Sequence, residues 1–125
     1  EANEGEILLM CELKTGALIE FCFLAPLTIA YTANEKWKRL GKIVGISFQL
    51  IDDLLDLQET SENLGKKSQK DIIRNKKNYP ISFGEKKTVE LLDVFKAEAN
   101  NLLQELNLDD HYLSNYIMNL FNRRI

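Results

Sequence analysis

Three acidic residues at helical spacing are the clearest sign of chemistry in this 125-residue chain. Asp52 and Asp56 lie one turn apart on one face of a predicted helix, and Asp53 lies beside them. They follow a segment without any charged residue, 43–51, which is typical of a helix that is buried on every side. Because an unpaired buried charge is costly, we expect a cation among the three carboxylates. Mg²⁺ suits an all-oxygen ligand set, since it binds few protein ligands and completes its coordination with water and phosphate oxygens.

A lysine-rich segment, residues 66–77, follows the three acids. A phosphate ester binds both metal ions and lysines, so the two clusters together favour a substrate of this class. The alternatives are a solvated basic loop beside solvated aspartates, or a weak nucleic-acid contact. No aromatic residues that could stack on bases alternate with these lysines, and the net charge is −3. We therefore expect no nucleic-acid partner.

The elements that position these residues are predicted to be helices, because apolar residues recur mostly at intervals of three and four. We expect an all-α fold. The predicted helices run from about Glu6 to Ala33 with a bend at Pro26, from Glu35 to Leu57, from Glu85 to Leu106, and from a cap at Asp109 or Asp110 onward. A long loop, residues 58–78, is expected between the second and third helices.

Small and sulfur-containing residues add three further expectations. Gly41 and Gly45, one turn apart, would let a neighbouring helix backbone approach closely. Cys11 and Cys22 would lie about 16 Å apart along one helix, whereas a disulfide requires Cα atoms within about 7 Å. We therefore expect two buried, reduced thiols and a cytoplasmic location. The longest strongly apolar uncharged stretch, residues 21–33, is too short for the about 20 residues that a membrane span requires.

Several short motifs occur together in one order along the chain. They are Lys14-Thr15-Gly16-Ala17-Leu18, Gly45, Phe48-Gln49, Asp52-Asp53-Leu54-Leu55-Asp56, Gly65-Lys66, Asp71, Lys76 and Tyr79-Pro80. In order and near-family spacing they resemble the C-terminal part of an all-trans isoprenyl diphosphate synthase. This is the polyprenyl synthetase family, and the short-chain farnesyl or geranylgeranyl type is nearest. The resemblance covers nearly the whole chain.

The resemblance implies a fold and a reaction. The fold would be the C-terminal part of an orthogonal helical bundle, with residues 1–125 forming a single partial domain. The reaction would be the condensation of an allylic diphosphate with isopentenyl diphosphate, with release of pyrophosphate and Mg²⁺ as cofactor. Electrostatic stabilisation by metal ions and lysines would carry this chemistry.

The resemblance also implies roles for individual residues. Asp52 would bind Mg²⁺ directly, while Asp53 and Asp56 would hold the ion partly through water. The lysines that would bind the allylic diphosphate are Lys14, Lys66 and Lys76. Thr15 and Gln49 would direct oxygens toward the carbocation, and Asp71 would order the lysines.

Two family features are missing upstream of Lys14-Thr15, namely a first aspartate-rich motif and the arginines for isopentenyl diphosphate. We therefore expect that this chain alone does not catalyse condensation. We expect it to form a homodimer or to pair with a missing N-terminal half, which would cover an exposed apolar face. The alternative is a non-catalytic helical subunit that modulates a synthase, although such a subunit would not need intact aspartates and lysines.

Overall fold

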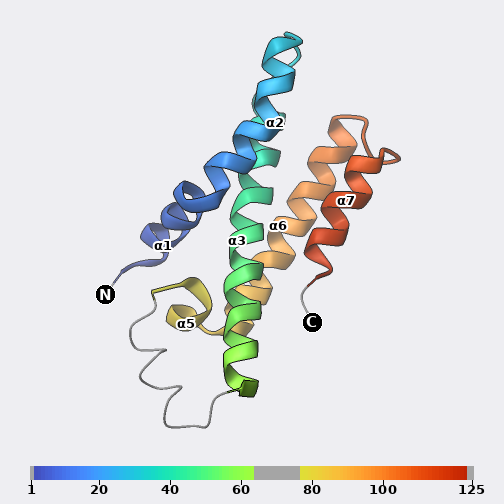
Figure 1. Cartoon of the computed structure of the whole chain (residues 1–125). Coiled ribbons are helices and arrows are strands. Elements are labelled where there is room, and N and C mark those ends of the chain that lie inside the picture. The colour runs from blue at the N-terminus through green and yellow to red at the C-terminus, as the bar shows by residue number, and fades with distance from the viewer. Residues whose placement is uncertain (1, 64–76, 124–125) are drawn as a thin grey trace.

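The computed structural model describes residues 2–63 and 77–123, and within those two ranges every regular element is a helix. The all-α prediction is therefore confirmed. The elements are α1 (Glu4–Cys11), a π-helical turn η1 (Glu12–Gly16), α2 (Ala17–Ile29), α3 (Glu35–Asn63), α5 (Tyr79–Phe83), α6 (Glu85–Glu105) and α7 (Tyr112–Phe121). Figure 1 shows α3 running through the middle, with α1 and α2 on one side of it and α6 and α7 on the other.

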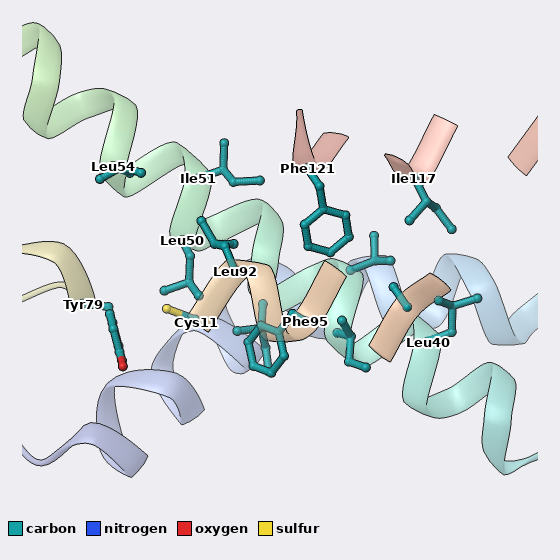
Figure 2. Packing of buried hydrophobic residues seen from close by; sticks show 14 of the residues in the cluster. Cys11, Leu40, Leu50, Ile51, Leu54, Tyr79, Leu92, Phe95, Ile117 and Phe121 are labelled. Atoms are coloured by element: carbon teal, nitrogen blue, oxygen red, sulfur yellow. The ribbon is translucent and has the colours of Figure 1, made fainter. Parts of the chain in front are cut away.

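Helix α3 forms the centre of the core because its middle segment, residues 43–51, carries no charged residue on any side. Its side chains at Leu40, Ile43, Leu50, Ile51 and Leu54 are all at most 2% exposed. Figure 2 shows Leu40, Leu50, Ile51 and Leu54 in one cluster with Leu92 and Phe95 of α6, Ile117 and Phe121 of α7, Cys11 of α1, and Tyr79 of α5. The expectation that segment 43–51 is buried on every side is confirmed, with Phe48 alone partly exposed.

Helices α2 and α3 cross at glycines, as the sequence predicted. A Cβ atom built on Gly45 would lie 2.5 Å from the Cα of Gly16 and 2.8 Å from its carbonyl oxygen. A Cβ on Gly41 would lie 3.2 Å from the Cα of Glu20. Only a hydrogen in place of the side chain lets the two backbones come this close.

The N-terminal helix departs from its predicted form at an internal turn and at its end, which falls at Ile29 rather than Ala33. A capping box fixes its start, since Asn3 Oδ1 accepts from the Glu6 N–H and a Glu6 carboxylate oxygen accepts from the Asn3 N–H. Regular α-helix then gives way to the π-helical turn at η1, and α2 continues through Pro26 to Ile29. π-Helical turns within α-helices occur frequently at functional sites.

Elsewhere the helices differ from the prediction in three ways. Helix α3 does not end at Leu57 but continues to Asn63, because residues 58–63 are polar but contain neither proline nor glycine. Residues 79–83, for which no helix was predicted, form the short helix α5, with Asn78 Oδ1 accepting from the Ile81 N–H at 3.0 Å. His111 rather than Asp109 or Asp110 caps α7, through Nδ1 accepting from the Leu113 N–H.

The two cysteines differ in their surroundings, so the expectation of two buried thiols was wrong for one of them. Both are free, but Cys22 is exposed because α2 has neighbours on only part of its surface and buries none of its residues. Cys11 is 1% exposed. Burial disfavours its thiolate and the Asp53 carboxylate repels it, so the pKa of Cys11 rises to about 11. In the part of the chain described, no helix combines the length and apolar character needed to cross a membrane.

Candidate functional site

A polar cavity of about 210 Å³ lies between η1, α3 and the start of α5. Its lining residues are Met10, Cys11, Lys14, Gln49, Asp53, Asp56, Lys77 and Asn78. Two carboxylates and two lysines therefore share one small space. A second cavity of about 530 Å³ between α2, α3 and α7 is mostly apolar and has no carboxylate or lysine in its lining, so it lacks the charged groups that the predicted chemistry needs.

The crossing of η1 and α3 positions one wall of the polar cavity. Gly16 against Gly45 sets the approach of the two backbones, and Lys42 Nζ lies 2.9 Å from a carboxylate oxygen of Glu12. Gln49 follows Gly45 by one turn of α3, and its Oε1 accepts a hydrogen bond from Thr15 Oγ1 at 2.9 Å. The predicted pair of Thr15 and Gln49 is thus joined by a direct hydrogen bond.

The same chain of hydrogen bonds continues to the acidic residues. Gln49 Nε2 donates to Asp53 Oδ1 at 3.0 Å, and both side chains are buried, at 4% and 8% exposure. Burial raises the pKa of Asp53, the Gln49 hydrogen bond and the charge of Lys14 lower it, and Asp52 and Asp56 raise it further. A divalent cation in the cavity would stabilise the charged form of this carboxylate.

The donor set fits Mg²⁺ that shares its coordination with a phosphate group. Asp53 and Asp56 both line the cavity and both offer oxygen ligands. Within residues 2–63 and 77–123, no three potential ligand side chains converge closely enough to hold a metal ion by themselves. Mg²⁺ is usually bound through one or two carboxylates together with water and substrate phosphates, so such an arrangement suits it.

Asp52 does not line the polar cavity. Its side chain is exposed and lines a separate small hollow with Phe48, Ile51, Leu55, Leu120 and Arg123. The structure therefore brings Lys14, Gln49, Asp53 and Asp56 together, with Thr15 attached through Gln49, but does not bring Asp52 to that cavity. The predicted residues Lys66, Asp71 and Lys76 lie outside the described part of the chain.

The structure adds cavity residues that sequence reasoning did not single out, above all Lys77. This lysine belongs to the basic segment, but nothing in the order of its lysines indicates which of them reaches the aspartates. Cys11 was interpreted only as a core thiol. Its spacing of three residues before Lys14 places it on the same side of the helix, which was a usable signal.

Comparison with known proteins gives a consistent set of matches. The family model described as Polyprenyl synthetase matches residues 1–111. Geranylgeranyl pyrophosphate synthase 10, mitochondrial, of Arabidopsis thaliana is 33% identical over 116 residues, which cover 87% of this chain and 34% of that protein. Geranylfarnesyl diphosphate synthase, chloroplastic, of Leucosceptrum canum is 36% identical over 93 residues, covering 72% of this chain and 26% of the relative.

A third relative is the heterodimeric geranylgeranyl pyrophosphate synthase large subunit 1, chloroplastic, of Arabidopsis thaliana. It is 32% identical over 99 residues, covering 77% of this chain and 27% of its own length. The chain thus spans about a third or less of the length of the curated relatives it matches. No solved structure matches it significantly.

Proposed function

Because the chain belongs to the polyprenyl synthetase family, we propose that it carries part of the active site of a prenyltransferase that condenses an allylic diphosphate with isopentenyl diphosphate. The observation that carries this proposal is the cavity in which Lys14 and Lys77 face Asp53 and Asp56. Carboxylates that hold a metal ion and lysines that hold phosphate oxygens form a binding site for a metal-bound diphosphate. The relatives named as geranylgeranyl and geranylfarnesyl diphosphate synthases support this substrate class.

In this proposal each cavity residue has a role that follows from its chemistry. Asp53 and Asp56 would hold Mg²⁺ from within the cavity, and Asp52, one turn from Asp56 on the same face of α3, would be the third metal-binding acid. Lys14 donates to diphosphate oxygens and stabilises the negative charge that develops on the leaving pyrophosphate. Bound Mg²⁺ would supply further positive charge for that leaving group. Lys66 and Lys76 complete the proposed set of diphosphate lysines, and Asp71 orders them.

The hydrogen-bonded pair of Thr15 and Gln49 supports a second part of the mechanism. Thr15 acts as donor to Gln49, so both lone pairs of its own oxygen stay available. That oxygen can stabilise the positive charge that develops on the allylic carbon as pyrophosphate leaves. Gln49 is hydrogen-bonded to both Thr15 and Asp53, and so fixes the carbocation-facing hydroxyl relative to the metal-binding carboxylate.

We expect the 125-residue chain to show no condensation when it is incubated with an allylic diphosphate, labelled isopentenyl diphosphate and Mg²⁺. The family's first aspartate-rich motif and its isopentenyl diphosphate arginines are not found in the sequence, and this single partial domain, residues 1–125, would supply only one side of the active site. A full-length synthase assayed in parallel controls for the substrates. Labelled product from the purified chain would contradict this expectation.

Exposed apolar side chains along α1, η1 and α2 support the proposed pairing. Leu9, Leu13, Leu18, Phe21 and Ile29 are 51–79% exposed. A stripe of this kind marks an interaction surface, so we propose that a second copy or the remainder of a synthase covers it. The alternative function is that of a subunit that modulates a synthase, and the relative named as a heterodimeric large subunit supports this alternative.

We propose the cytoplasm as the compartment, in line with the free thiols. The names of the relatives place those proteins in mitochondria or chloroplasts.

We expect the purified chain to sediment as a dimer, and the L13E/F21E variant to sediment as a monomer. Each substitution places a carboxylate in the apolar stripe, where pairing would bury it without a partner. V94E is the matched control, because Val94 is 60% exposed but lies on α6, away from the stripe. A wild-type chain that stays monomeric over the accessible concentration range would contradict self-pairing.

A further inference from the structure

Lys77 is the second cation of the polar cavity and comes from a different element than Lys14. Lys14 lies on η1, whereas Lys77 lies two residues before the start of α5, so the two lysines reach the cavity from different elements. We propose that Lys77 is a diphosphate-binding residue and that Tyr79 is the residue that positions it. This inference rests on the proposed function, since it names a further group for the same substrate.

The two residues that follow Lys77 are fixed by hydrogen bonds to two helices, α5 and α1. Asn78 is 9% exposed, and its Oδ1 accepts from the Ile81 N–H within α5. Tyr79 is fully buried, and its hydroxyl donates to a carboxylate oxygen of Glu4 at 2.6 Å, across to α1. Figure 2 shows this hydroxyl pointing toward the N-terminal helix.

The carboxylate that receives the Tyr79 hydrogen bond is itself held. Its other oxygen lies 3.2 Å from Lys87 Nζ of α6, and this ammonium group lies 4.6 Å from the centre of the Phe83 ring. Burial and the neighbouring Glu4 both raise the pKa of Tyr79, which keeps its hydroxyl protonated as a donor. Consecutive Cα atoms are about 3.8 Å apart, so a fixed Tyr79 confines the backbone of Lys77 to the rim of the cavity.

The charges in the cavity explain why a second lysine is needed. Lys14 alone offsets one of the two carboxylates, Asp53 and Asp56, whereas Lys77 brings the lining to neutrality. A diphosphate ester carries more negative charge than one Mg²⁺ neutralises. With a divalent cation on the two aspartates, Lys77 gives the incoming diphosphate a second charge-assisted donor beside Lys14.

Calorimetric titration of the 125-residue chain with pyrophosphate and Mg²⁺ at low salt tests the role of Lys77. We expect K77Q to bind pyrophosphate about tenfold more weakly than wild type, and K77R to restore most of the affinity. K86Q is the matched control, because the Lys86 side chain is 93% exposed and its Nζ lies 3.9 Å from a carboxylate oxygen of Glu90, which makes a weak ion pair. If K77Q binds as tightly as wild type, the inference is overturned. If the wild-type chain itself binds no pyrophosphate, the proposed function is contradicted together with the inference.

A double-mutant cycle tests the positioning role of Tyr79. Y79F keeps the buried ring but removes the hydrogen bond to Glu4, and we expect it to weaken pyrophosphate binding several-fold. In the K77Q background the same change should have almost no further effect, because there is no ammonium group left to position. Equal losses in both backgrounds, or a lower melting temperature with unchanged affinity, would show that Tyr79 is only a structural residue.

Discussion

Replacing Gly45 with alanine is expected to lower the free energy of unfolding by about 2 kcal/mol. The new Cβ would lie 2.5 Å from the Cα of Gly16, and both sides of this contact are backbone. Overpacking of this kind costs about 1–3 kcal/mol or more, while the higher helix propensity of alanine returns only about 1 kcal/mol. Urea denaturation followed by circular dichroism measures the difference.

A matched glycine provides the control for this substitution. Gly5 lies in α1, and a Cβ there would meet only the Asn3 Oδ1 atom at 3.4 Å, which is ordinary contact. G5A should therefore leave stability unchanged or raise it by up to about 1 kcal/mol. G45A should also weaken pyrophosphate binding, because separating α3 from η1 lengthens the hydrogen bond between Thr15 and Gln49. A G45A chain as stable as wild type would contradict the close helix crossing.

Neutralising all three acids, as D52N/D53N/D56N, is expected to abolish the Mg²⁺ dependence of pyrophosphate binding, with an affinity loss of at least about 100-fold. Even groups that only orient metal ligands contribute about 10–100-fold to metal affinity, so removing the proposed ligands costs more. The fold should persist, because three adjacent carboxylates on one helix repel each other and amides do not. Titration with pyrophosphate at several Mg²⁺ concentrations measures both affinity and its metal dependence.

The control for this variant removes the same number of charges elsewhere. Glu85, Asp109 and Asp110 are exposed and do not line the polar cavity, so E85Q/D109N/D110N should keep Mg²⁺-dependent binding. D52N alone separates the contribution of Asp52, which lies outside the cavity, from that of Asp53 and Asp56, which line it. Unchanged metal dependence in D52N/D53N/D56N would contradict the proposed magnesium site.

Much of the fold follows from local sequence patterns. Periodic apolar residues predict α6, whose boundaries differ by one residue from the prediction, and the charge-free run predicts the buried centre of α3. The end of α3 could not be predicted, because a solvent-exposed polar segment has the same composition in a helix and in a loop. Helix α5 was missed because five residues are too few for a periodic signal, and its stability comes from Tyr79 packed against other helices.

Part of the candidate site could likewise be predicted from the sequence, and part could not. Lys14, Thr15 and Gln49 follow from the resemblance of their motifs to the family, and the glycine crossing that joins their helices follows from two small residues one turn apart. Which aspartate faces the cavity depends on the rotation of α3 about its axis, which is set by distant packing rather than by the motif itself. The position of Lys77 depends on a hydrogen bond between residues 75 positions apart, and no local pattern encodes it.

A crystal structure of the chain with Mn²⁺ and pyrophosphate tests the central claim most directly, because anomalous scattering locates the metal independently of the protein. We expect a manganese peak beside the Asp53 and Asp56 carboxylates, with pyrophosphate oxygens in contact with the Lys14 and Lys77 ammonium groups. Metal and pyrophosphate bound elsewhere, for example beside Arg123, or absent from the polar cavity at saturating concentrations, would contradict the account.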